Sequence, residues 1–210
     1  MLPVYLLYGA PTSGKGTICK KFPLAYIISM GQLLRQHKMV QGGELTDTRL
    51  VNGILIQELN KKKNLPYVIL DGYPRTKEQC DFLKAQKGIS IEKFIHLTCS
   101  DETVIYRTSQ RQSCTCGASY MPVLKPSLKE GICDLCGNKL FKRSDDNPEE
   151  IRKRLQIYHR ETAEILKEFK DVYIEINMDT DRNFHQAPKI IAKINNQHFN
   201  FLLNEKTNDG

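Results

Sequence analysis

The stretch GAPTSGKGT, residues 9–17, follows the apolar run Val4–Tyr8 in this chain of 210 residues. It satisfies the pattern G-x-x-x-x-G-K, in which glycines let backbone N–H groups converge on phosphate oxygens at the start of a helix, while the lysine reaches the outer phosphates. A hydroxyl from Thr17 or Ser13 can also help to order phosphate or magnesium. The stretch predicts a strand, a phosphate loop and a helix, with binding by Gly9, Ser13, Gly14, Lys15, Gly16 and Thr17.

A second stretch supports a phosphate site. Val68-Ile-Leu is an apolar strand pattern that ends in Asp71, and Gly72-Tyr-Pro-Arg75 follows it. An acid at the end of a strand beside a phosphate loop commonly holds the magnesium shell, directly or through water. Arg75 adds a cation that can clamp a second phosphate group. We therefore expect Asp71 and Arg75 to lie near Lys15.

Five apolar runs alternate with helical patterns along the chain. Their continuous apolarity predicts strands that are covered on both faces, as in the parallel sheets of α/β folds. Between them, Thr76 with Gln79 forms a possible capping box, Gly88 can close that helix, and Asn147-Pro148 predicts the start of another. The predicted strands are Val4–Tyr8, Ala25–Ile28, Val68–Leu70, Phe94–Leu97 and Val172–Ile176.

The composition is that of a globular domain, with 26% charged and 40% apolar residues. The net charge of +7 favours polyanionic partners but does not separate nucleic acid from free nucleotides. No apolar run reaches the roughly 18 to 20 residues that a membrane span needs. Seven cysteines, an odd number, favour a reducing compartment, so we expect a cytoplasmic protein without membrane contact.

Four of the cysteines cluster in an irregular segment rich in proline and glycine, between about Arg111 and Arg143. The pairs Cys114-x-Cys116 and Cys133-x-x-Cys136 resemble zinc ligands, although the first pair is one residue short. Structural Zn²⁺ and four free thiols are both open. A zinc ribbon in a basic chain also suggests nucleic-acid binding, but Tyr120 and Phe141 are the only aromatic residues nearby.

Taken in order, these motifs resemble the adenylate kinase family, in its form with a zinc-type lid. The resemblance spans nearly the whole chain and rests on GAPTSGKGT, Ser29-Met-Gly-Gln-Leu-Leu-Arg35, Asp71-Gly-Tyr-Pro-Arg75-Thr with Gln79, Arg107 with Arg111, Arg143-Ser-Asp-Asp146, and Arg154 with Tyr158. It implies a three-layer P-loop kinase fold with a central parallel five-stranded sheet. It also implies phosphoryl transfer from ATP, with Mg²⁺, to a nucleoside monophosphate, usually AMP.

The resemblance implies how the chain divides into segments and which role each site residue has. A core would comprise residues 1–29, 46–110 and 144–203, with a short acceptor-binding insert at 30–45, a lid at 111–143 and a flexible tail at 204–210. Catalysis would fall to Lys15, Arg75, Arg111, Arg143 and Arg154. Arg107 and Tyr120 would contact ATP, and the monophosphate would be bound by Met30, Arg35, Leu45, Gly72, Arg75, Gln79, Arg143 and Arg154. A monomer without nucleic-acid partners is expected.

The sequence departs from the family pattern at several points. Met30 and Gln32 replace a threonine and an acid, and only ten residues, Gln36 to Leu45, follow Arg35 before Thr46. The helix after the phosphate loop looks short because Pro23 follows closely, and Thr12 occupies a position that is often glycine. Three alternatives therefore stay open: a kinase for UMP, CMP or another monophosphate, a nucleotide-binding paralogue with weak activity, and a zinc-ribbon nucleic-acid binder.

Overall fold

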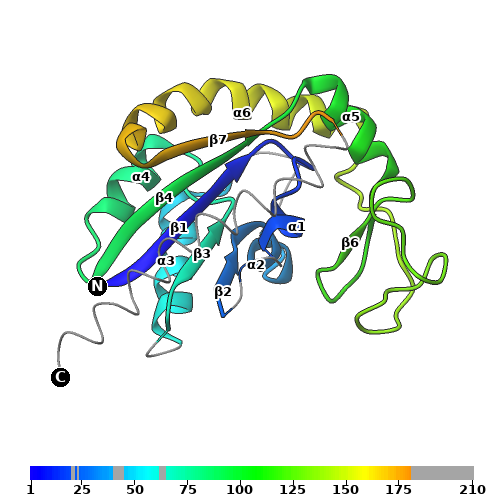
Figure 1. The fold of residues 1–210 in the computed structure, drawn as a ribbon, viewed down its shortest axis with the longest axis horizontal. Coiled ribbons are helices and arrows are strands. Elements are labelled where there is room, and N and C mark those ends of the chain that lie inside the picture. Colours follow the sequence, from blue (N-terminus) through cyan, green and yellow to red (C-terminus); the bar gives the residue numbers. More distant parts are fainter. Residues whose placement is uncertain (20–21, 23, 40–44, 62–64, 181–210) are drawn as a thin grey trace.

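The computed structural model describes residues 1–19, 22, 24–39, 45–61 and 65–180. Within these ranges, five parallel strands form one sheet in the order β2-β3-β1-β4-β7 (Figure 1). The strands are β1 (Leu2–Gly9), β2 (Tyr26–Ser29), β3 (Val68–Asp71), β4 (Ile89–Thr98) and β7 (Tyr173–Asn177). The five predicted strands and their parallel arrangement are confirmed, and β4 is longer than its apolar run predicted.

Helices connect these strands. They are α1 (Lys15–Cys19), α2 (Met30–Gln36), α3 (Thr48–Asn60), α4 (Lys77–Lys84), α5 (Asp101–Gln110) and α6 (Pro148–Glu168), followed by a short 3₁₀ turn at Lys170–Val172. Within the described residues, the helix after the phosphate loop covers Lys15–Cys19 and Phe22 already lies beyond it, which agrees with the short helix expected ahead of Pro23. None of the helices in the described ranges is long and apolar enough to cross a membrane.

The capping residues explain where two of the helices begin. Asn147 accepts a hydrogen bond from the Glu150 backbone N–H at 3.0 Å, and Pro148 takes the first helical position of α6. Thr76 likewise accepts from the Gln79 N–H at 3.2 Å at the start of α4. The closure predicted at Gly88 is wrong, because α4 ends at Lys84 and Gly88 lies in the turn before β4.

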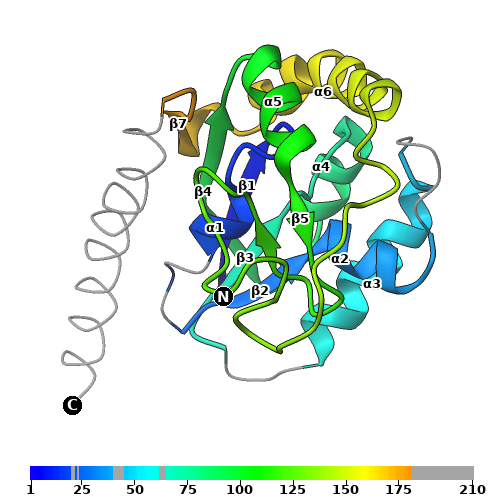
Figure 2. The ribbon, with the colours of Figure 1, turned by 90° about the vertical axis from the view of Figure 1, so that its right-hand side faces the viewer.

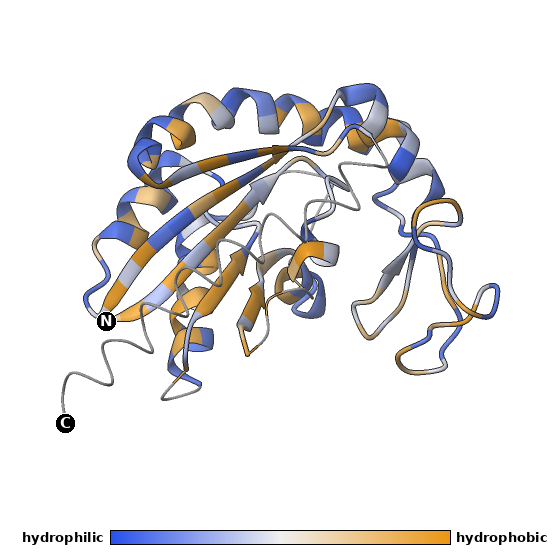
Figure 3. Cartoon of the chain, in the orientation of Figure 1, coloured by the Kyte–Doolittle hydropathy of each residue, from blue (hydrophilic) through white to orange (hydrophobic). Residues whose placement is uncertain are grey.

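The core has two halves because successive residues of β1 point to opposite faces of the sheet. Leu6 packs on one face with residues of α3, α4 and α6, while Leu7 packs on the other with Ile18 of α1. Burying one such side chain contributes about 1.5–3 kcal/mol. This two-sided burial explains the continuous apolar strands, whereas α6 carries both hydrophilic and hydrophobic residues along its length (Figure 3).

The lid follows α5 and stands beyond the carboxyl ends of the strands (Figures 1 and 2). Strand β5 (Gln112–Ser113) pairs with β6 (Ser119–Tyr120), and Ser113 also bridges to Phe141, where the lid returns. Its buried core is small and consists of Cys114, Ala118, Tyr120 and Cys133. Parts of two predicted segments, residues 40–44 of the insert and 181–203 of the core, and the whole tail at 204–210 lie outside the described residues.

Candidate active site

A pocket lies where the carboxyl ends of β1 and β3 meet the lid. The parallel register places Leu7 beside Asp71, so the phosphate loop after β1 and the acid at the end of β3 lie at the same edge of the sheet. Fourteen of the predicted site residues line this pocket: Gly9, Gly14, Lys15, Gly16, Thr17, Arg35, Leu45, Asp71, Gly72, Arg75, Arg111, Cys116, Arg143 and Arg154. Residues from five segments distant in sequence are therefore brought together.

The Lys15 ammonium lies folded over its own loop. It donates to the carbonyl oxygens of Gly9 and Ala10, both at 2.7 Å, and approaches Ser13 Oγ at 3.4 Å. Burial lowers the pKa of Lys15 to about 8, and the nearby Asp71 carboxylate opposes this shift. Gly9 is required here, because a Cβ atom would lie 2.4 Å from the Leu97 carbonyl oxygen. The loop thus holds a partly desolvated cation that a phosphate would stabilise.

Thr12 adopts a left-handed backbone conformation with φ of 57°. Glycine, which is often found at this position, adopts this region freely, whereas β-branched residues rarely do. The Thr12 side chain offers a physical reason. Thr12 Oγ1 lies 3.2 Å from Thr108 Oγ1 and 2.7 Å from the Pro11 carbonyl oxygen. The hydroxyl therefore ties the phosphate loop to α5, the helix that leads into the lid.

Asp71 faces the pocket as predicted. Ser29 donates a hydrogen bond to Asp71 Oδ2 at 2.9 Å, which orients the carboxylate. Thr17 lines the same pocket, so a carboxylate oxygen and a hydroxyl oxygen are both present there. Magnesium prefers oxygen ligands and usually keeps several waters beside one or two carboxylates. These residues fit a Mg²⁺ ion that arrives with a nucleotide.

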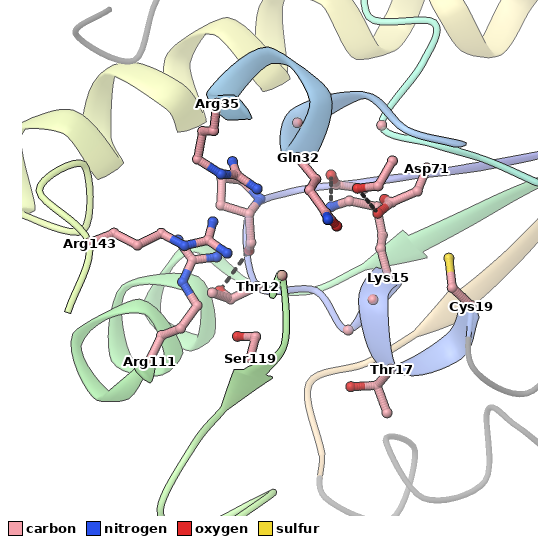
Figure 4. Close-up of a pocket in the computed structure, with 18 of the residues that line it drawn as sticks. Thr12, Lys15, Thr17, Cys19, Gln32, Arg35, Asp71, Arg111, Ser119 and Arg143 are labelled. Atoms are coloured by element: carbon pink, nitrogen blue, oxygen red, sulfur yellow. Dashed lines mark hydrogen bonds between the residues drawn. The ribbon is translucent and has the colours of Figure 1, made fainter. Parts of the chain in front are cut away.

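Three guanidinium groups gather on the other side of the pocket. Figure 4 shows the head groups of Arg35 from α2, Arg111 from the end of α5 and Arg143 from the lid exit close together. Burial lowers the pKa of Arg143 to about 9, with the charges of Arg111 and Arg35 acting in the same direction. Within the described residues, Arg35 forms no hydrogen bond or ion pair through its side chain. Repulsion among these three guanidinium charges favours the binding of a multiply charged anion between them.

Asp146 anchors this cluster. Arg111 donates from Nε to Asp146 Oδ2 at 2.7 Å and from Nη2 to Oδ1, and the Asp146 side chain is fully buried. Its neighbour Asp145 accepts from Arg154 at 3.3 Å. Burial lowers the pKa of Arg154 to about 10. No role was predicted for Asp146, although two adjacent acids, Asp145 and Asp146, follow Arg143 after a single serine and are a signal for one.

Arg75 is held by its own turn. Its Nε donates to the Gly72 carbonyl oxygen at 2.9 Å, and its backbone N–H donates to Gln79 Oε1 at 2.7 Å. Gly72 has φ of +73°, and a Cβ atom there would lie 3.0 Å from Arg75 Nη2. Gln79 therefore supports Arg75 instead of completing the capping box with Thr76.

The remaining predicted site residues lie outside the lining of the pocket. Ser13, Met30 and Gln79 are buried behind it. Arg107 is 2% exposed and donates to the Met178 carbonyl oxygen at 2.6 Å. Tyr120 belongs to the small core of the lid. Their burial supports structural roles for these five residues, in the phosphate loop, the start of α2, α4, α5 and the lid.

The four lid cysteines form one cluster. Their sulfur atoms all lie within 4.8 Å of one another, with Cys114 and Cys136 at 3.3 Å and Cys116 and Cys133 at 3.6 Å. A tetrahedral zinc ion with Zn–S bonds of about 2.3 Å would separate its thiolates by about 3.8 Å. The Tyr120 hydroxyl donates to Cys133 Sγ, and this bond lowers the pKa of Cys133 to about 6. The cluster fits a four-coordinate zinc ion.

The shorter cysteine pair keeps the backbone turn of the longer one. The Cys133 carbonyl accepts from the Gly137 N–H at 2.9 Å, four residues on, and the Cys114 carbonyl accepts from the Gly117 N–H at 3.0 Å, three residues on. Both glycines have positive φ, 73° and 91° respectively. The missing residue shortens the turn by one position without removing its closing hydrogen bond.

Several residues line the pocket without having been predicted to do so, among them Gln32, Tyr8 and Tyr158. Gln32 approaches the lid closely, since a Cβ atom on Gly117 would lie 2.6 Å from Gln32 Oε1. Tyr8 and Tyr158 line the wall beside α6. Tyr158 follows Arg154 by one helical turn, which is a signal for a shared face, whereas Tyr8 had no signal beyond its place before Gly9.

Comparison with known proteins decides the family. The adenylate kinase family model matches residues 7–174. The chain belongs to the adenylate kinase family. Curated adenylate kinases from three organisms agree: Methanosarcina acetivorans (33% identity, over 90% of this chain and 98% of the relative), Caldicellulosiruptor bescii (34%, 79% and 86%) and Trichlorobacter lovleyi (36%, 80% and 86%).

Membership confirms the resemblance, the P-loop kinase fold and the expectation of an enzyme that transfers phosphoryl groups between nucleotides. An adenylate kinase needs cationic groups around the migrating phosphoryl group, because its transition state spreads negative charge over the transferred oxygens. The phosphate loop, Asp71 and the arginine cluster form a surround of this kind at the carboxyl edge of the sheet.

Proposed function

We propose that the protein transfers the terminal phosphoryl group of ATP to AMP in a reversible reaction that yields two ADP. One observation carries the proposal: Lys15 and five arginines from separate segments line a single pocket, namely Arg35, Arg75, Arg111, Arg143 and Arg154. A surface salt bridge is the ordinary use of an isolated arginine. Several guanidinium groups gathered around one cavity are instead suited to polyphosphate.

In this reaction the chain positions and stabilises the migrating group. We assign the phosphates of ATP to the phosphate loop and Lys15, and the acceptor phosphate to Arg35 and Arg75. Arg111, Arg143 and Arg154 then surround the transferred phosphoryl group, where their charge matches the charge of the transition state. No general base is required, because the acceptor oxygen is already anionic. Closure of the lid excludes water that would otherwise hydrolyse ATP.

Magnesium enters with ATP as part of the proposal. Asp71 would hold the ion or its waters, with Thr17 as a second oxygen ligand. A bound magnesium ion neutralises phosphate charge and fixes the orientation of the two terminal phosphates. The hydrogen bond from Ser29 keeps the Asp71 carboxylate in place for this role.

A coupled assay for ADP with ATP and each of AMP, UMP, CMP and GMP tests the proposal. We expect AMP to give the highest ratio of kcat to KM. Higher turnover with UMP or CMP would instead favour a kinase for pyrimidine monophosphates. Absence of turnover with all four would favour the nucleotide-binding paralogue.

We further infer that AMP binds less tightly here than in relatives with a longer insert. Only Gln36 to Leu45 follow Arg35 before Thr46, and Met30 supplies a weakly accepting thioether in place of a hydroxyl. Fewer contacts cover the acceptor, so the dissociation constant should be raised. An equilibrium titration with AMP measures it, and an affinity equal to that of a relative with a longer insert, measured alongside, would contradict this inference.

The proposed ATP contacts of Arg107 and Tyr120 would require both side chains to leave buried positions, and the base contacts of Met30 and Gln79 require the same. These four assignments have less support than those of the residues that line the pocket. We retain the cytoplasm as the proposed location and the monomer as the proposed state. All seven cysteines lie in the described residues and none forms a disulfide, which suits a reducing compartment.

We propose structural zinc in the lid, held by Cys114, Cys116, Cys133 and Cys136. The lid has few buried apolar residues of its own, so a metal would supply much of its stability. This role leaves the phosphate chemistry to the arginines on either side of the lid. Nucleic-acid binding is not required to explain the cluster.

Metal analysis should find about one zinc ion per chain, as four thiolates make one closed site. Chelation, or the change Cys133→Ser, should make the segment 114–143 sensitive to proteolysis while the core stays resistant. Cys99→Ser, outside the cluster, is the matched control and should keep both the metal and the resistance. A metal-free protein with an equally resistant lid would contradict the zinc assignment.

A further inference from the structure

A chain of hydrogen bonds runs from the wall of the pocket to the edge of the sheet. The Tyr158 hydroxyl, on α6, lies 2.6 Å from His96 Nε2, on β4. His96 Nδ1 lies 3.1 Å from the Tyr173 hydroxyl, on β7. The Tyr173 hydroxyl in turn lies 2.6 Å from Glu175 Oε2. Three elements of the fold are therefore linked through one buried imidazole.

The chemistry of the groups fixes the direction of each bond. An ionised carboxylate only accepts hydrogen bonds, so Tyr173 donates its proton to Glu175. The Tyr173 oxygen must then accept from His96, which places the imidazole proton on Nδ1. A neutral imidazole carries one N–H, so Nε2 accepts from Tyr158. His96 is 4% exposed, and burial lowers its pKa to about 4, which keeps the ring neutral near pH 7.

A second tyrosine is tied in the same manner. The ring of Tyr8 stacks on the ring of Tyr158 with centroids 5.6 Å apart and an interplanar angle of 27°. Thr162 donates its hydroxyl proton to the Tyr158 carbonyl oxygen, so Tyr8 donates to Thr162 Oγ1 at 3.0 Å. Both tyrosine hydroxyls are thus committed to partners in the fold, while both residues line the pocket.

The stacked pair lines the same pocket as Arg75. Burial raises the pKa of Tyr8 to about 12, and the hydrogen bond to Thr162 and the nearby charge of Arg75 partly oppose this shift. Arg75 is the residue to which we assign the acceptor phosphate. An acceptor nucleotide held there would lie against the rings of Tyr8 and Tyr158.

We propose that His96 is a positioning residue for the acceptor nucleotide: its Nε2 accepts the Tyr158 hydroxyl and fixes the Tyr158 ring against Tyr8, so that the two rings form a rigid wall beside Arg75. The inference rests on the proposed transfer to a nucleoside monophosphate. A wall that is already ordered loses little conformational entropy when the nucleotide binds. Loss of the imidazole acceptor leaves the Tyr158 hydroxyl without its partner and lets the ring turn.

Calorimetric titration with AMP tests the consequence. His96→Leu removes the acceptor, and we expect the dissociation constant for AMP to rise about threefold to tenfold, while that for ATP stays within about twofold. His96→Gln provides an amide oxygen that can accept from Tyr158, and it should recover most of the affinity. Recovery by this variant separates positioning from a mere loss of packing.

Nitrogen-15 NMR of the imidazole tests the bond directions directly. In the wild type at pH 7, Nδ1 should carry the proton and Nε2 should be bare. Tyr173→Phe removes the acceptor for Nδ1–H, so it should shift the tautomer toward Nε2–H and weaken AMP binding in the same direction as His96→Leu. Tyr26→Phe is the matched control. Tyr26 lies on β2, the opposite edge strand, and its hydroxyl also donates to a glutamate, Glu58 of α3, at 3.0 Å.

An unchanged AMP affinity in His96→Leu, or an Nε2–H tautomer in the wild type, would overturn the positioning role. A wild type that binds AMP but transfers no phosphoryl group would instead overturn the proposed function, because affinity and tautomer are measured without turnover. A change in Tyr26→Phe equal to that in Tyr173→Phe would also count against the proposal, since it would show a general effect of losing a tyrosine hydroxyl.

Discussion

Lys15→Met is expected to lower the rate of phosphoryl transfer at least about a hundredfold, the usual effect of removing one preorganised charge from a transition state. The Lys15 ammonium donates hydrogen bonds to its own loop, at 2.7 Å from the carbonyl oxygens of Gly9 and Ala10. Burial leaves the cation poorly solvated, which lowers its pKa to about 8. A phosphate that reaches the ammonium therefore stabilises its charge strongly. Methionine keeps the length of the side chain but removes this charge.

Steady-state kinetics with ATP and AMP measures the effect, and circular dichroism checks that the variant is folded. The matched control is Lys153→Met, whose ammonium lies on the exposed face of α6 beside Glu149 at 3.0 Å. We expect the control to keep near-normal turnover. Near-normal turnover of the Lys15→Met variant would contradict the assignment of Lys15 to the phosphates of ATP.

Asp146→Ala should have the largest effect on stability. Its carboxylate is fully buried and accepts two hydrogen bonds from Arg111, whose side chain is 10% exposed. Removal of one partner from a buried ion pair typically costs about 3–5 kcal/mol, because the other charge stays buried without compensation. Turnover should fall as well, since Arg111 belongs to the cluster that we assign to the migrating phosphoryl group.

Urea unfolding measures this loss of stability. Asp146→Asn keeps an oxygen acceptor for Arg111 and should lose less than the alanine variant. Glu149→Ala removes an exposed carboxylate from the first turn of α6, which begins two residues after Asp146, and should leave the unfolding midpoint nearly unchanged. Similar midpoints for Asp146→Ala and Glu149→Ala would show that Arg111 does not depend on its buried partner.

Much of the fold could be predicted because its signals are local. Continuous apolar runs such as Val4–Tyr8 and Val68–Leu70 reveal strands covered on both faces, and the spacing of Gly9, Gly14 and Lys15 is that of a phosphate loop. The caps at Thr76 and Asn147 depend only on residues three positions away. Parallel pairing then brings Asp71 to the phosphate loop without further information.

The rest depended on tertiary contacts that no local pattern encodes. The left-handed φ of Thr12 is tolerated beside Thr108, which lies 96 positions later in the chain. Gln79 has an ordinary capping partner in Thr76, yet the turn at Gly72 brings the Arg75 N–H to its side chain instead. The burial of Arg107 against Met178 likewise follows from how β7 ends. In each case the side chain has several possible partners, and tertiary packing decides which of them it contacts.

The stoichiometry of ATP consumption tests the central claim most directly. Phosphorus-31 NMR of the protein with ATP, Mg²⁺ and AMP should show two ADP formed for each ATP consumed, no release of inorganic phosphate, and no consumption of ATP when AMP is left out. One ADP and one inorganic phosphate for each ATP, independent of AMP, would identify an ATPase and contradict phosphoryl transfer between nucleotides.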